Sequence, residues 1–115
     1  MENRSPDPAL VERDMKTLEA LVRAGADLDR PLTVDHFVYV ATEREARDAA
    51  AELSKHGFAI SIDEREGGGQ WVVIATRKEL LSPSTIADLR NLLTSCAERH
   101  GGDYDGWGAE VNATG

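Results

Sequence analysis

Apolar residues recur along the first part of the chain at two different periods, which separate a helix from a strand. Spacings of three and four residues predict a helix from residue 9 to Gly25, because that period places side chains on one helical stripe. The buried stripe is expected to consist of Val11, Met15, Leu18 and Val22, with Leu21 alongside. The run Val34–Ala41 is apolar on both of its alternating faces, which predicts a central strand covered on both sides.

The middle of the chain predicts a second helix and a pair of strands. Thr42, with a glutamate three residues later, has the pattern of a capping box, and the helix it opens should end before Gly57. Residues 58–64 alternate strictly between apolar and polar positions, which is typical of a half-exposed strand. The glycines at 67–69 predict a turn that joins this strand to residues 70–76, another run that is apolar on both faces.

The last part of the chain predicts a third helix and then a glycine-rich segment. Ser82 and Pro83 are typical of an N-cap and a first helical turn, and the helix should end at Gly101. Cys96 lies on its apolar stripe, so we expect a small core residue and not a nucleophile. Residues 107–111 are candidates for a short last strand.

With that last strand, the order of elements after the first helix is β-α-β-β-α-β, as in ferredoxin-like domains. We therefore predict an α+β fold, a ferredoxin-like split βαββαβ sandwich preceded by an N-terminal helix. The N-terminal helix is expected to cover the sheet face that the other two helices leave free, since two strands are apolar on both faces. Residues 1–115 should form a single domain, with 1–7 as a disordered lead-in and 112–115 as a frayed tail.

Composition narrows the class of protein. A chain of 115 residues has little room for both a core and a deep substrate cleft, which disfavours an enzyme. The formal net charge of -8 repels nucleic-acid backbones and attracts a basic protein. No apolar run has the length of a membrane span or the pattern of a signal peptide, so we expect a cytoplasmic protein.

Candidate chemistry in the sequence is sparse. The three histidines, His36, His56 and His100, do not have the spacing of a metal pair, so we predict no metal and no cofactor. Asp35 beside His36 resembles a carboxylate that orients a base, but neighbours on a strand point to opposite faces. We therefore expect no catalytic residues.

The aromatic residues are few, and two of them lie in the glycine-rich segment. Phe37, Phe58 and Trp71 are candidates for the core, because each lies in a strand run. Tyr104 and Trp107 lie near Asp103 and Asp105, and rings with acids at the rim are typical of protein interfaces. The alternative is that Trp107 plugs one end of the core while Tyr104 anchors the turn.

Four stretches of the sequence resemble one family. They are YDGWG (104–108), the preceding AERHGGD (97–103), TVDHFVYV (33–40) and HGFAIS (56–61). In these the chain is similar to the regulator of ribonuclease activity B (RraB) proteins, inhibitors of the endoribonuclease RNase E. The resemblance covers residues 10–111 and implies a ferredoxin-like domain without catalytic activity that binds the ribonuclease and restrains RNA turnover.

Together these observations predict a non-enzymatic regulator that binds and inhibits an RNase E-type endoribonuclease through a basic region of that enzyme. It would be a monomer or a weak homo-oligomer with no direct contact to nucleic acid. The predicted partner-binding residues are Asp35, His36, Asp103, Tyr104, Asp105 and Trp107. The alternative is a ferredoxin-like module that senses a small ligand, in a pocket lined by His36, Tyr39 and Trp71, or an interaction module unrelated to ribonuclease.

Overall fold

The structure is a computed structural model and describes residues 7–111. The expectations for residues 1–6 and for the tail 112–115 therefore lie outside the described residues. Asp7, which we expected in the lead-in, belongs to the folded part. Its carboxylate accepts a hydrogen bond of 2.9 Å from the Ala9 N–H and caps the first helix.

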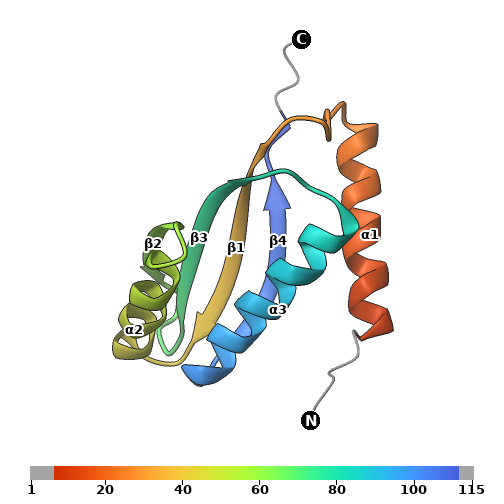
Figure 1. Cartoon of the computed structure of the whole chain (residues 1–115). Coiled ribbons are helices and arrows are strands. Elements are labelled where there is room, and N and C mark those ends of the chain that lie inside the picture. Colours follow the sequence, from red (N-terminus) through yellow and green to blue (C-terminus); the bar gives the residue numbers. More distant parts are fainter. Residues whose placement is uncertain (1–6, 112–115) are drawn as a thin grey trace.

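Three helices and four strands make up the described chain (Figure 1). They are α1 (Pro8–Arg23), β1 (Leu32–Val40), α2 (Glu43–Ser54), β2 (Ala59–Glu64), β3 (Trp71–Glu79), α3 (Pro83–Arg99) and β4 (Asp103–Ala109). The strands pair antiparallel in the order β2-β3-β1-β4, so β1 and β3 are central. This is the ferredoxin-like arrangement, and the predicted fold is confirmed.

Local sequence signals form as predicted. The Thr42 hydroxyl accepts a hydrogen bond from the Glu45 backbone N–H, and the Glu45 carboxylate accepts one from the Thr42 backbone N–H, which is a capping box at the start of α2. The Ser82 hydroxyl caps α3 in front of Pro83. Gly101 follows α3 with a φ of 73°, a conformation that side chains with a Cβ rarely adopt, so the chain can turn sharply into β4.

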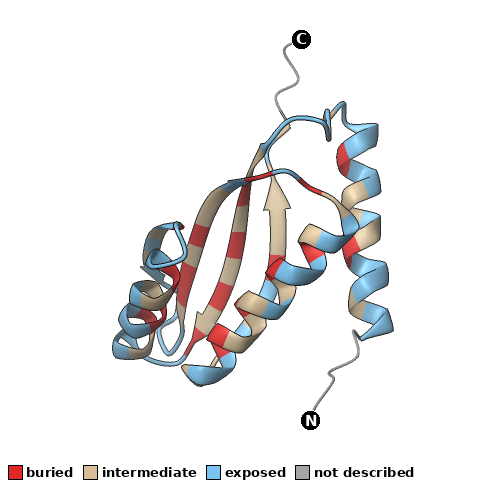
Figure 2. Ribbon diagram, in the orientation of Figure 1, coloured by how far each residue is buried: buried red, intermediate tan, exposed pale blue. Residues whose placement is uncertain are grey.

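The core lies between one face of the sheet and helices α2 and α3 (Figure 2). Alternate residues of β1 point into it, and the buried positions on that strand are 0 to 2% exposed. The α3 stripe predicted from the sequence is buried, Cys96 included. The small side chains of Ala46 and Ala49 let α2 approach the sheet closely.

Helix α1 lies on the same side of the sheet as α2 and α3, next to α3 at the β4 edge (Figure 1). Its Leu21 packs with Val34 of β1 and Ile86 of α3, which both belong to the helix-covered side. The expectation that α1 covers the opposite face is therefore wrong. Among residues 7–111, no helix covers that face, which we call the open face.

The predicted stripe of α1 is confirmed only in part: Met15, Leu18 and Leu21 pack against the core, but the two ends of the stripe do not. Val11 and Val22, expected to be buried, are 40% and 50% exposed. The buried positions are Leu21 and Asp14. The helix turns this way because Asp14 has charged and polar partners in the interior, as described below.

The last strand differs from its predicted span. It begins at Asp103, not near residue 107, and so contains the whole YDGWG stretch. The pairing with β1 shifts between Phe37 and Val38, which makes a bulge around Asp105 and Gly106. Gly106 has a φ of 127°, so the glycine permits the bulge.

Candidate partner-binding surface

Strands β1 and β4 lie side by side and bring the six predicted partner-binding residues together. In their register His36 is opposite Trp107, Asp35 is opposite Gly108, and Asp103 is opposite Tyr39. Because side chains alternate along each strand, the set is divided between two faces of the sheet. The rings of His36, Tyr104 and Trp107 face the helices, whereas the carboxylates do not.

The inward-facing rings belong to a buried polar network. The Tyr104 hydroxyl lies 2.9 Å from His36 Nδ1, and the Trp107 indole N–H donates a hydrogen bond of 3.0 Å to Asp14. Asp14 also accepts two hydrogen bonds of 2.7 Å from the Arg90 guanidinium, which lies over the Tyr104 ring. The network joins α1, α3, β1 and β4. Trp107 is half-buried and packs against the cluster of Leu21, Val34 and Ile86, which favours the core role of the two left open for it.

His36 is a neutral histidine of the core. The side chain is 1% exposed and stacks edge-on against Phe58. Burial, with a smaller contribution from the Arg77 charge, lowers the pKa of His36 to about 4. Its Nε2 has no hydrogen-bond partner among the described residues. The imidazole is therefore inaccessible to a partner protein, and protonating it would place an unpaired charge in the interior.

This burial predicts an acid-sensitive fold. The unfolded chain takes up a proton on His36 near the ordinary histidine pKa of 6.5, whereas the folded chain does so only near 4. The free energy of unfolding therefore keeps its full value above pH 6.5. It falls by roughly 3 kcal/mol as the pH falls toward 4, for a pKa difference of this size. Urea denaturation between pH 7 and pH 4 should show this loss reduced in His36→Gln. The variant His56→Gln, which removes an exposed imidazole, should show the full loss of stability between pH 7 and pH 4. An equal loss in both variants would contradict the attribution to His36.

The carboxylates of the set are accessible on β4 and next to it. Asp103 and Asp105 are exposed, and Asp35 is half-buried, where it accepts a hydrogen bond of 2.6 Å from the Thr76 hydroxyl. Arg13 of α1 donates to the backbone carbonyl of Asp105 at 3.0 Å and so holds the bulge in place. Of the predicted residues, these three carboxylates can meet a partner.

The open face also carries apolar residues whose role the sequence did not reveal. Phe37, expected in the core, points to this face because its neighbour His36 takes the inward position. It lies opposite Ile74 of β3, and Tyr39 lies opposite Val72 in the same way. We call these four residues the apolar centre. The apolar character of both faces is visible in the sequence and predicts cover on both sides, whereas within residues 7–111 helices cover only one face.

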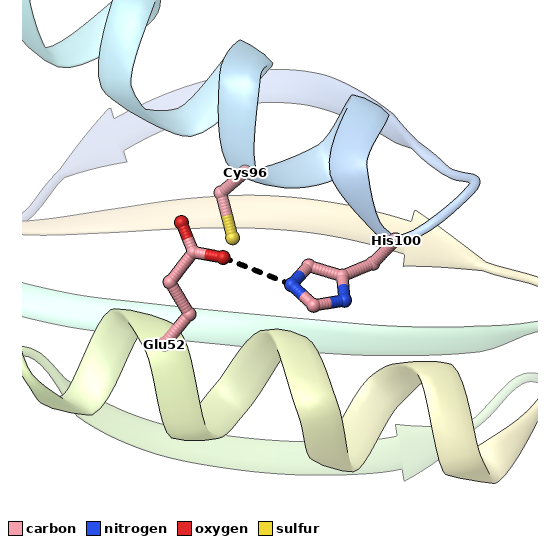
Figure 3. A group of neighbouring side chains, drawn as sticks. All are labelled: Glu52, Cys96 and His100. Carbon is pink, nitrogen blue, oxygen red and sulfur yellow. Dashed lines mark hydrogen bonds and ion pairs between the residues drawn. The ribbon is translucent and has the colours of Figure 1, made fainter.

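A second polar group joins the ends of α2 and α3 (Figure 3). Glu52, Cys96 and His100 offer ligand atoms within 4.8 Å of one another, and zinc accepts all three types. Sequence spacing could not reveal the group, because Glu52 is more than forty residues away from the others.

Glu52, however, already has partners in this group. The Arg99 guanidinium donates to its carboxylate, and His100 Nε2 lies 2.9 Å away. The Arg99 hydrogen bond lowers the pKa of Glu52 to about 2, and burial raises the pKa of the Cys96 thiol to about 11. A cation would have to displace the guanidinium and a tightly held thiol proton. We interpret the group as a structural tie between the helices.

The predicted small-ligand pocket does not form. His36 and Tyr39 point to opposite faces of the sheet, so the two side chains cannot line one cavity with Trp71. A groove of about 340 Å³ lies elsewhere, between α1 and α3, with Leu10, Met15 and Ile86 in its walls. Two of the charged groups that line it, Asp14 and Arg90, are already paired with each other.

The fold and the surface define a class: a small ferredoxin-like α+β domain whose conspicuous features are an accessible acidic edge and an open sheet face. The comparison with known families identifies the family. The family model described as "Regulator of ribonuclease activity B" matches residues 12–109, and the chain belongs to this family.

A curated relative agrees with the family assignment. The chain is similar to the "Regulator of ribonuclease activity B" of Photobacterium profundum, with 29% identity over 104 residues. The alignment covers 84% of this chain and 77% of the relative. The resemblance noted in the sequence is therefore confirmed. In the part of the chain that the structure describes, no helix has the length and apolarity needed to cross a membrane.

Proposed function

We propose that this chain is a non-catalytic regulator, active in the cytoplasm, that binds an RNase E-type endoribonuclease and inhibits it. The observation that carries the proposal is the match of residues 12–109 to a family of regulators of ribonuclease activity. The buried state of the His36 imidazole and of the Cys96 thiol supports a non-catalytic role, because neither group can reach a substrate in this fold.

The charge of the chain supports a basic region of the ribonuclease as the binding partner. The formal net charge is -8, and an enzyme that binds RNA presents clustered Arg and Lys side chains. Asp103 and Asp105 are exposed on an edge strand whose rings are fixed in the core, so these carboxylates are held by a rigid support. Complementary charge of this kind raises the rate of association and sets the orientation of the partners.

The proposal is tested by calorimetric titration of the chain into the purified RNase E-type endoribonuclease of the same organism. We expect association at low salt, weakening as salt is added, and slower cleavage of a model RNA in its presence. The double variant Asp103→Asn/Asp105→Asn should bind about fivefold more weakly, because two rim charges are lost.

The matched control is Asp48→Asn/Asp88→Asn, which makes the same change in net charge at exposed positions of α2 and α3. It should bind within about twofold of the unmodified chain if position matters more than net charge. If the unmodified chain shows no association at low salt, the proposed function is wrong. If both double variants weaken binding equally, the acidic edge is not the contact.

A further inference from the structure

The open face of the sheet has the composition of a contact surface and not that of a solvent-facing sheet. In an antiparallel sheet with one covered face, the other face normally carries polar side chains. Here the two central strands place the apolar centre (Phe37, Tyr39, Val72 and Ile74) on the side that no helix of residues 7–111 covers, with Val72 buried and the other three side chains half-buried. A contiguous apolar patch with polar residues around it is characteristic of an interaction site.

The β4 side of this patch is bare. Phe37 lies opposite Gly106, and Asp35 lies opposite Gly108, so neither has a cross-strand side chain to cover it. A Cβ placed on Gly108 would meet no atom within 4 Å, whereas one on the buried Gly106 would lie 3.4 Å from the Arg13 guanidinium. The glycines of YDGWG therefore place no side chain of β4 beside Phe37 or Asp35, and the space beside Asp35 is open to another molecule.

Charges on the open face indicate what that molecule carries. Carboxylates surround the apolar centre: Asp63 lies opposite Val72, Asp103 lies opposite Tyr39, and Asp35 lies on the same strand as both rings. The guanidinium of Arg65 already lies over the Tyr39 ring, 5.0 Å from its centroid. An aromatic ring with carboxylates nearby favours a cation, and Arg65 shows such a contact within the chain.

A second copy of the chain fits this face poorly. Each copy has a formal net charge of -8, and face-to-face packing would bring the Asp35, Asp63 and Asp103 carboxylates of both copies together. Like charges across an interface are unfavourable. A basic partner gains from the same charges.

We propose that the open face binds a basic segment of the ribonuclease, with a large apolar side chain of that segment seated beside Phe37 and its Arg or Lys side chains meeting the surrounding carboxylates. This inference rests on the proposed function. It names the contact surface and the chemistry of the segment that the surface accepts.

The test uses the variant Phe37→Thr in the full chain, with titration into the purified RNase E-type endoribonuclease of the same organism. Threonine keeps the β-branched character that suits a strand and removes the apolar anchor. We expect the Kd to rise by at least about tenfold, as for an anchor residue at the centre of an interface. Ile74→Thr, directly opposite on β3, should also raise the Kd. This variant replaces Phe37→Thr as the test if Phe37→Thr does not fold.

The control is Val22→Thr, which removes a 50% exposed apolar side chain from α1, on the other side of the sheet. It should change the Kd by less than about twofold. If folded Phe37→Thr and Ile74→Thr bind as tightly as the unmodified chain, the open face is not the contact, although the proposed function stands. If the unmodified chain does not bind, the proposed function fails, and this assignment with it. Sedimentation that shows a dimer abolished by Phe37→Thr would overturn the assignment in favour of a second copy.

Discussion

Replacing Asp14 by alanine should lower the free energy of unfolding by about 4 kcal/mol, the range found when one partner of a buried ion pair is removed. Asp14 is 4% exposed and accepts both hydrogen bonds from the Arg90 guanidinium. The substitution leaves that guanidinium unpaired in the interior and also removes the acceptor of the Trp107 N–H. Urea denaturation at pH 7 measures the loss.

The matched control for Asp14→Ala is Glu12→Ala on the same helix. Glu12 pairs with Lys16, but both side chains are at least 70% exposed, so its loss should cost less than about 1 kcal/mol. The double variant Asp14→Leu/Arg90→Met should recover part of the stability, because no unpaired charge is left behind. A loss below about 1 kcal/mol for Asp14→Ala would show that water reaches Arg90 and that the network does not hold α1 in place.

The variant Gly102→Ala should be destabilised by about 3 kcal/mol, the upper part of the range for overpacking. A Cβ at this position would lie 2.1 Å from the Tyr39 carbonyl oxygen and 2.6 Å from Val40 Cγ1. Tyr39 cannot move aside, because β1 is paired with β3 on one side and with β4 on the other. The N–H of Gly102 is also fixed, by a hydrogen bond of 2.8 Å to the Ala97 carbonyl.

Gly108→Ala is the matched control on the same strand. Its Cβ would meet nothing within 4 Å, and Gly108 does not have a positive φ. Alanine should therefore be tolerated, or should stabilise the fold by up to about 1 kcal/mol through the loss of freedom in the unfolded chain. Thermal or urea unfolding of the two variants side by side gives the comparison. Equal stability would show that the turn after α3 can shift.

These two sites connect stability to the proposed contact surface. Asp14 and Gly102 both determine where β4 lies, the first through Trp107 and the second through the turn that enters the strand. Strand β4 carries Asp103 and lies beside Phe37 of the open face. A destabilised variant at either site should therefore be assessed for folding before its binding to the ribonuclease is interpreted.

Local elements of this protein were predictable from short-range sequence patterns. Three such features are the capping box at Thr42, the cap at Ser82 and the glycine turn at 67–69. Each depends on residues a few positions apart, so a short stretch of sequence contains every residue that forms it. The order of helices and strands follows from these signals. Together with the family resemblance, that order was enough to predict the ferredoxin-like topology.

The position of α1 was not predictable in the same way. The apolar spacing of α1 indicated a stripe through Val11 and Val22, yet Asp14 is buried and these valines are exposed. A buried carboxylate is tolerated only with partners, and its partners Arg90 and Trp107 are 76 and 93 positions away in the sequence. Helical periodicity contains no information about such distant groups.

The sequence by itself determined the elements, their order, the acidic character and the family, because these depend on local pattern, composition or similarity. Only the tertiary structure decided which face of the sheet is open and which predicted site residues a partner can reach. Strand alternation assigns neighbours to opposite faces but does not say which face the helices cover. The side that the helices take decided that the rings of His36 and Trp107 face the core, while Phe37 and Asp103 face outward.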